Sequence, residues 1–232
     1  MSSITQALQF VNQEIQQALA QAHRPPNSVA LLAVSKTKPL SDIAAAYQAG
    51  QRLFGENYVQ EGVDKIVQSR QQTWLKDPIE WHFIGPLQSN KTRLVAEHFD
   101  WMQTLARDKI AERLNAQRPN KMAPLQVCLQ VNISQESAKS GLSLTQVDEL
   151  AAYVASLPNL TLRGLMAIPQ KLDNDQRLDQ QFKAMAEKFS QLQQQYASVD
   201  TLSMGMSGDM QDAINHGSTM VRIGSAIFGQ RG

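Results

Sequence analysis

The sequence predicts a single (β/α)8 barrel, in which eight parallel strands alternate with helices around a closed ring. Eight short apolar segments alternate along the chain with segments of helical periodicity, a pattern typical of parallel sheets with helical crossovers. No linker or change of composition divides residues 1–232, which we expect to form one domain with residues 1–24 packed on the barrel as a helix. An open doubly wound sheet has the same alternation, and the number of elements makes it the second choice.

An N-terminal helix is expected over residues 3–22. Its apolar residues recur at the spacing of one helical face and are Ile4, Leu8, Val11, Ile15 and Leu19. Ser3 and Gln6 have the spacing of a capping box at the start of this helix. Pro25 and Pro26 end it, because proline cannot continue a helix.

The remaining elements follow in strict alternation. The expected strands are residues 28–36, 52–58, 80–85, 101–106, 125–132, 161–168, 201–207 and 220–229. The expected helices are residues 40–50, 59–72, a segment after Ser89, and residues 107–117, 144–156, 175–197 and 208–216. Together they supply the eight units of one barrel.

Composition excludes several classes of protein. The formal net charge is +1, with 22 Lys and Arg against 21 Asp and Glu, which argues against a protein built mainly to bind nucleic acid or anionic membranes. A single cysteine excludes an internal disulfide framework. The N-terminus lacks the pattern of a secretory signal, and no apolar run approaches the roughly 18 residues of a membrane span. We therefore expect a soluble, cytoplasmic protein.

Lys36 follows the apolar segment LLAVS, at the carboxyl end of the first expected strand. Reactive groups of such barrels gather at the carboxyl ends of the strands. Strand alternation places Leu32, Val34 and Lys36 on one face, so an inward-facing Lys36 would point into the barrel mouth. Taken alone, the residue is better interpreted as a solvated or salt-bridged lysine just past a strand.

The last two strand segments supply groups suited to a phosphate. Gly224 and Ser225 follow Arg222, and glycine lets backbone N–H groups approach an anion while the serine adds a hydroxyl donor. Ser203 and Ser207 lie one unit earlier, just before a short expected helix. The loops after strands seven and eight form the recurrent phosphate site of this fold, although each segment alone is also a plausible glycine turn.

Barrel closure would bring these groups together, because the first and last strands are neighbours only in a closed barrel. Lys36 and Arg222 would then lie on adjacent strands beside the phosphate site. A lysine amine forms a Schiff base with an aldehyde, and pyridoxal 5′-phosphate (PLP) has both an aldehyde and a phosphate. The residues therefore indicate a phosphorylated carbonyl ligand, with a phosphate-handling barrel enzyme that does not use PLP as an alternative.

Six motifs occur in order across residues 28–229: AVSKTKP, FGENYVQE, WHFIGPLQSNK, GLMAIP, LSMGMS and VRIGSAIFG. Together they closely resemble the YggS/PROSC family of PLP-homeostasis proteins. The resemblance implies the fold of the N-terminal barrel of alanine racemase, without the second domain of that enzyme. It also implies a PLP-binding protein that buffers or delivers PLP, affects vitamin B6 and amino-acid and keto-acid balance, and has no established turnover.

The resemblance assigns a role to each site residue. Lys36 is expected to form the Schiff base with PLP, and Arg222 to face the pyridine nitrogen. The expected phosphate contacts are Ser207, Gly224 and Ser225, with Ser203 assisting. Asn57 and Met166 are expected to line the ring, and Lys38 is implied as a transient second amine. Gly208 departs from the family, which often has an acid there, so the charge beside the phosphate loop is in question.

Three functional hypotheses follow. The first is a PLP carrier that is not an enzyme, acts as a monomer and has PLP-dependent apo-enzymes as recipients. The second is a PLP-dependent enzyme such as a small amino-acid racemase or lyase. The third is the phosphate-handling barrel without PLP.

Other chemically reactive residues are given structural roles. Cys128 lies in an apolar strand with nothing adjacent to lower the pKa of its thiol, so we expect a buried, inert thiol. The four histidines lack metal-ligand spacing, and no metal is expected. His82 is expected to be a strand residue with a local hydrogen bond. The basic residues within 88–93 are either solvated or part of a second surface for an anion or a partner.

Overall fold

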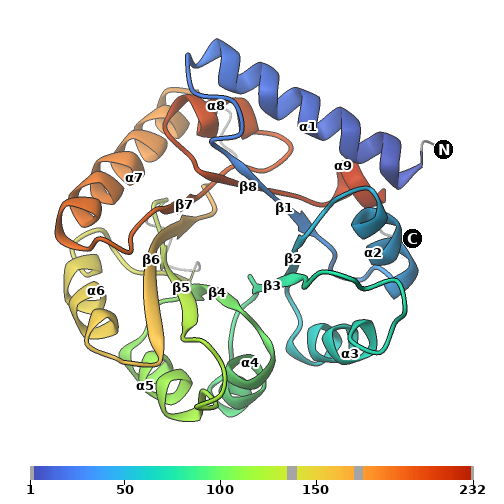
Figure 1. Ribbon diagram of the computed structural model, residues 1–232. Helices are drawn as coiled ribbons and strands as arrows, with labels where there is room; N and C mark the ends of the chain where they lie inside the picture. The colour runs from blue at the N-terminus through green and yellow to red at the C-terminus, as the bar shows by residue number, and fades with distance from the viewer. Residues whose placement is uncertain (1–2, 135–139, 170–174, 231–232) are drawn as a thin grey trace.

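A computed structural model describes residues 3–134, 140–169 and 175–230. Its eight strands form a closed barrel in the order β1 to β8, and every neighbouring pair is parallel (Figure 1). The barrel prediction is confirmed and the open sheet is wrong. Closure depends on β1 pairing with β8, where Leu32 lies opposite Arg222. We call this strand pair the seam.

The strands are β1 (Ala30–Val34), β2 (Leu53–Glu56), β3 (Glu80–Phe83), β4 (Trp101–Leu105), β5 (Leu125–Val131), β6 (Leu160–Ala167), β7 (Thr201–Ser203) and β8 (Met220–Ile223). The helices outside them are α2 (Leu40–Gln48), α3 (Val59–Ser69), α4 (Thr92–His98), α5 (Asp108–Gln117), α6 (Val147–Ala155), α7 (Asp175–Gln195) and α8 (Met210–Asn215). A single 3-10 turn, Ser89–Lys91, leads into α4. Each expected element has a counterpart, and the differences lie mainly at the ends.

Two C-terminal strands are shorter than expected. The segment 220–229 leaves the sheet at Ile223 and continues as the short helix α9 (Ser225–Phe228). β7 ends at Ser203, and Gly205 two residues later has a φ of +100°, a conformation that glycine adopts without steric cost. A side chain at position 205 would also meet the Cβ atom of Ala213 at 2.7 Å. Both early endings turn the chain into loops at the same barrel mouth.

The N-terminal helix α1 (Ile4–Gln21) packs beside the seam, against α2, α8 and α9 (Figure 1). The expected apolar face is buried at Leu8, Val11, Ile15 and Leu19, and Ile4 packs partly buried against the core. The Ser3–Gln6 capping box is formed, with Ser3 Oγ accepting from the Gln6 N–H. The main core lies between the strands and the helices, because alternate strand residues such as Leu31 and Ala33 point outward into it.

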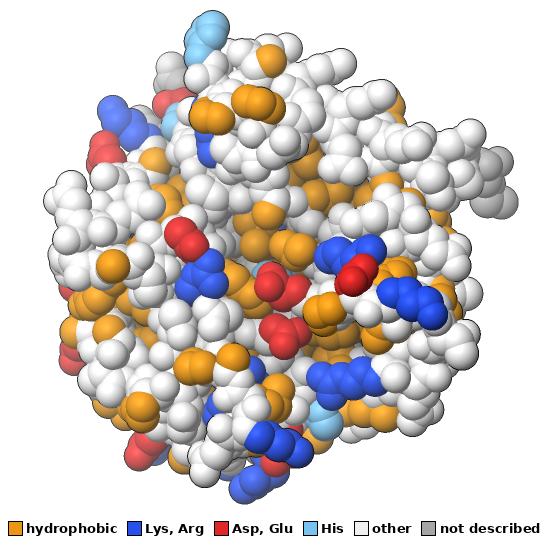
Figure 2. All heavy atoms as spheres, viewed as in Figure 1, with side chains coloured by type: hydrophobic (Ala, Val, Ile, Leu, Met, Phe, Trp, Pro, Cys, Tyr) orange, Lys and Arg blue, Asp and Glu red, His pale blue; other side chains and the backbone are white. Residues whose placement is uncertain are grey.

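The barrel interior holds a second, smaller apolar cluster, formed by Trp101, Cys128 and Met166. Cys128 is completely buried, and burial raises the pKa of its thiol to about 12, so the expected inert thiol is confirmed. On the face shown in Figure 2, acidic and basic side chains are interspersed, in keeping with the near-zero net charge. Within the described residues, no helix has the length and apolar character needed to span a bilayer.

Candidate functional site

A cavity of about 480 Å³ opens at the carboxyl ends of the strands, beside the seam. Its volume lies in the range of pockets that take small ligands. The lining includes five of the eight predicted site residues, namely Lys36, Ser207, Arg222, Gly224 and Ser225, together with Lys38. Barrel closure therefore brings together an amine, a guanidinium and two hydroxyl-bearing loops from opposite ends of the chain.

Lys36 faces this cavity because of strand alternation. Val34, two residues earlier on the same face of β1, also lines the cavity, whereas Ser35 points outward and is fully buried. Ser35 remains tied to the barrel, since its N–H donates to the Gly55 carbonyl at 3.0 Å. The predicted inward face of the first strand is thus correct. Lys38 Nζ lies at the rim, where it donates to the carbonyl oxygen of Gln230 at 3.1 Å.

The loops after β7 and β8 form the second wall of the cavity. Gly224 packs closely on β1, since a Cβ atom there would lie 3.1 Å from the Val34 carbonyl oxygen. Asp209 follows Gly208 and also lines the cavity, so an acid is present beside this loop one position after the glycine. Its carboxylate accepts from the Met206 N–H at 2.6 Å, and burial raises its pKa. The two loops therefore combine the hydroxyl groups of Ser207 and Ser225 with one acidic group, Asp209.

Arg222 forms the floor of the cavity and is almost completely buried. Its Nη1 donates to Ser203 Oγ and its Nη2 to the Ala167 carbonyl oxygen, each at 2.8 Å. Burial lowers the pKa of Arg222 to about 10, and the nearby Asp209 charge acts in the opposite direction. The guanidinium is therefore a fixed cation at neutral pH.

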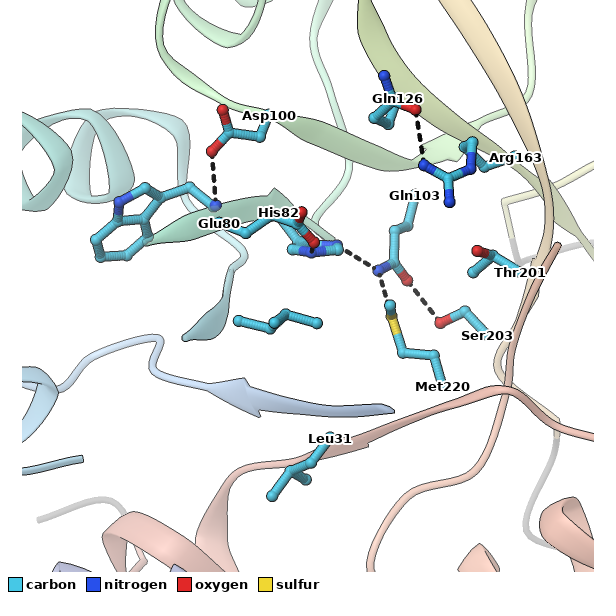
Figure 3. Close-up of polar contacts among 12 residues, drawn as sticks. Leu31, Glu80, His82, Asp100, Gln103, Gln126, Arg163, Thr201, Ser203 and Met220 are labelled. Atoms are coloured by element: carbon cyan, nitrogen blue, oxygen red, sulfur yellow. Dashed lines mark hydrogen bonds and ion pairs between the residues drawn. The ribbon is translucent and has the colours of Figure 1, made fainter. Parts of the chain in front are cut away.

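Ser203 does not line the cavity, because its hydroxyl points into the barrel. There it accepts from Arg222 and donates to Gln103 Oε1 at 2.6 Å. Gln103 Nε2 in turn contacts His82 Nδ1 at 2.9 Å and Met220 Sδ at 3.2 Å (Figure 3). His82 Nε2 lies 2.9 Å from Glu80 Oε1, which completes a polar chain from Arg222 to the other end of the barrel.

The order of donors and acceptors along these hydrogen bonds determines the charge of His82. Because Gln103 Oε1 accepts from Ser203, the Gln103 amide N–H donates to His82 Nδ1, and the imidazole hydrogen is on Nε2 facing Glu80. Burial lowers the pKa of His82, in agreement with a neutral ring. The expected local hydrogen bond of His82 is confirmed. The role of Gln103 was not predicted, although alternation from Trp101 already places this polar residue inside the barrel.

Asn57 and Met166 are not among the residues that line the cavity. Met166 is fully buried against Trp101 and Cys128. Asn57 follows β2, and its buried Oδ1 has no hydrogen-bond partner within the described part of the chain. Its backbone packs tightly against the next loop, since a Cβ atom at Gly85 would lie 1.9 Å from the Asn57 carbonyl oxygen. Their expected contacts with the ligand ring stay predictions.

Comparison with known proteins agrees with this geometry. The family described as alanine racemase, N-terminal domain, matches residues 9–232. A pyridoxal phosphate homeostasis protein from Pasteurella multocida is 58% identical over 231 residues, covering 99% of this chain and 98% of the relative. The chain belongs to the family of pyridoxal phosphate homeostasis proteins. The protein of the same name from Escherichia coli K12 is 56% identical, covering 100% of this chain and 98% of its own.

Solved structures extend the comparison. PipY of Synechococcus elongatus, whose structure was solved with PLP bound, superimposes with a TM-score of 0.75 at 34% identity, covering 93% of this chain and 100% of PipY. An unknown protein from Bifidobacterium adolescentis superimposes with a TM-score of 0.88 at 32% identity, covering 97% of this chain and 94% of its own. Alanine racemase of Corynebacterium glutamicum shares the fold alone, with a TM-score of 0.69 at 14% identity, covering 98% of this chain and 62% of the racemase.

Proposed function

We propose that this protein binds PLP in the cavity beside the seam, through a Schiff base at Lys36, and that it buffers or delivers the coenzyme. The observation that carries the proposal is the convergence of Lys36, Arg222 and the loop of Gly224 on one cavity. The donor set fits the ligand, because PLP combines an aldehyde, a basic ring nitrogen and a phosphate. PipY, a relative with the same fold, has been solved with PLP bound.

Each group has one task in this proposal. Ser207, Gly224 and Ser225 bind the phosphate through hydroxyl and backbone N–H donors. Arg222, held in place by Ser203, would face the pyridine nitrogen. Lys36, in its neutral form, adds its nitrogen to the aldehyde carbon, and the carbonyl oxygen leaves as water. When bound, PLP supplies that aldehyde and a conjugated ring that accepts electrons.

A carrier role is favoured over turnover by the charge of Arg222. A guanidinium facing the pyridine nitrogen disfavours protonation of that nitrogen, and an unprotonated ring is a weaker electron acceptor. Racemisation further requires a proton donor or acceptor on each face of the substrate, with a pKa near the working pH. Lys36 supplies one such group. Sustained racemisation of a free amino acid by the pure protein would overturn this part of the proposal.

The binding proposal is tested by absorbance and mass spectrometry. Protein mixed with PLP is expected to develop the absorbance band of a Schiff base, to lose it on borohydride reduction and to retain a pyridoxyl group on the peptide containing Lys36. The Lys36→Ala variant is expected to show no band. A colourless wild-type protein, or an adduct on another lysine, contradicts the proposal.

Delivery has an assay of its own. The PLP-loaded protein is mixed with a PLP-dependent apo-enzyme, and reactivation is timed against the same concentration of free PLP. Faster reactivation supports direct transfer of PLP to apo-enzymes. Reactivation no faster than with free PLP leaves buffering as the function.

A further inference from the structure

Three charged side chains lie directly behind the Lys36 loop, between β2 and α3. Lys65 Nζ contacts Glu56 Oε1 at 2.9 Å, Glu61 Oε1 at 2.6 Å and the Ser35 carbonyl oxygen at 2.8 Å. The Glu56 side chain is fully buried, and that of Lys65 is 9% exposed. We call Glu56, Glu61 and Lys65 the charged triad. It lies on the opposite side of the loop from the cavity.

The charged triad holds the residues on both sides of Lys36. Ser35 Oγ donates to Glu56 Oε1 at 2.5 Å, and the Ser35 carbonyl accepts from Lys65. On the other side, the Thr37 N–H donates to Glu61 Oε1 at 2.6 Å. Hydrogen bonds to charged groups are stronger than those between neutral groups. The backbone of Lys36 is therefore fixed at both ends while its side chain enters the cavity.

Thr37 has a φ of +62°, in the left-handed region. A β-branched residue there is a steric outlier, and such a conformation persists only where its surroundings enforce it. The carboxylate of Glu61 on the Thr37 N–H is such an enforcing contact. The turn that directs Lys36 inward is thus maintained against the local preference of its own sequence.

The burial of Glu56 and Lys65 distinguishes the charged triad from an ordinary surface ion pair. On the same helix, Gln60 and Asp64 form an exposed side-chain contact at the same spacing as Glu61 and Lys65. Removing charges from water is unfavourable, and a buried ion pair is weak evidence for added stability. Burial also raises the pKa of Glu56. Glu61 closes the group from the rim, with its side chain 28% exposed. Two buried opposite charges and a third at their edge are better explained by the geometry they impose than by stability.

We propose that Glu61 and Lys65, supported by Glu56, are positioning residues that aim the Lys36 amine at the aldehyde of the ligand. The inference rests on the proposed Schiff base at Lys36. In that step the amine nitrogen bonds to the aldehyde carbon and the aldehyde oxygen leaves as water, so no oxidant or reductant is needed. Precise approach of the two reacting atoms governs such a step, and small misplacements reduce its rate strongly.

The test compares PLP with pyridoxine 5′-phosphate, which has the same ring and phosphate but a hydroxymethyl group in place of the aldehyde. Glu61→Ala is expected to slow formation of the Schiff-base band and weaken PLP binding, each by roughly tenfold or more. Binding of pyridoxine 5′-phosphate is expected to change by less than about twofold, because it forms no bond to Lys36. Asp64→Ala, on the same helix, is the matched control and is expected to change the binding of neither ligand.

Glu61→Gln keeps an acceptor for the Thr37 N–H but removes the charge facing Lys65, so an intermediate effect on PLP is expected. This variant also serves if Glu61→Ala does not fold. Equal losses for both ligands would indicate a general structural role and overturn the inference, as would unchanged binding of PLP. A wild-type protein without any Schiff-base band refutes the proposed function itself, which keeps the two failures distinguishable.

Discussion

Arg222 depends on a chain of neutral groups that extends across the barrel interior. Ser203 and Gln103 each use one donor and one acceptor in this chain, and His82 is neutral at its far end. The groups facing His82 are Glu80, Asp100 and Arg163, of which Glu80 makes the direct contact. The orientation of the cation in the cavity is therefore linked to the protonation of a histidine at the opposite end of the barrel.

This link predicts acid sensitivity. The pKa of His82 is lowered in the folded protein from its ordinary value of 6.5, so the unfolded chain binds the proton more tightly. The contribution of neutral His82 to the free energy of unfolding is fully present above pH 6.5. It decreases as the pH falls below this value, by up to roughly 1.4 kcal/mol per pH unit. Urea unfolding of His82→Asn at pH 7.5 and pH 5.5 is expected to show a smaller acid loss than wild type.

The exposed His23 provides the control for this measurement. His23→Asn is expected to keep the full acid sensitivity of the wild type. An undiminished acid loss in His82→Asn would disprove the linkage.

Asp209 predicts a charge effect on the ligand. Its carboxylate lines the cavity beside Ser207, where a phosphate dianion would be repelled. Asp209→Asn keeps an oxygen for the Met206 N–H and removes the charge, so PLP affinity is expected to rise about fivefold, or roughly 1 kcal/mol. Titration of the absorbance band measures this change. Asp212→Asn, an exposed acid on α8, is the control, and weaker binding by Asp209→Asn would contradict the proposed phosphate position.

At the scale of elements, α1 covers the seam and stabilises the cavity from outside. Ile15 is 1% exposed, and Ile15→Ala is expected to lower the free energy of unfolding by roughly 2–5 kcal/mol. Phe10 lies on the same helix but is 58% exposed, so Phe10→Ala is expected to stay within about 0.5 kcal/mol of wild type. Denaturant unfolding monitored by circular dichroism measures both. Equal effects would show that the buried face of α1 does not contribute as described.

The elements also show how far the sequence alone can predict the structure. Lys36 was predictable because alternation within one strand is a local property, and its orientation follows from Val34. The inward orientation of the Ser203 hydroxyl was not predictable, because it depends on a hydrogen bond to Gln103, a hundred residues away. The helical turn after Gly224 was also missed, since SAIF is as apolar as a strand. The contacts of Lys65 with Ser35 and Glu56 likewise appear only when α3 packs on the barrel.

At the scale of the whole molecule, the ligand would join the first and last strands of the barrel. Lys36 follows the first strand and Gly224 follows the last, so binding at both is expected only in the folded barrel. PLP at about 100 times its dissociation constant should therefore raise the free energy of unfolding by about 2.7 kcal/mol. Thermal or urea unfolding with and without PLP measures this gain.

Lys36→Ala is expected to lose most of the PLP-dependent gain in stability, because the covalent contact is absent. Lys91→Ala removes an exposed lysine of the basic stretch 88–93 and is expected to retain the gain in full. Loss of the gain in Lys91→Ala would instead assign this stretch to the binding of the phosphate. That outcome would favour the second anion surface considered from the sequence.

The seam has a consequence for the chain during its synthesis. The arginine at position 222 and the glycine loop that complete the surroundings of Lys36 are translated long after the lysine itself, because they belong to the last strand of the barrel. A growing polypeptide thus presents an ordinary surface lysine to the cell's free aldehydes. On the proposed function, selective capture of the vitamin begins only after β8 has been translated and has paired with β1.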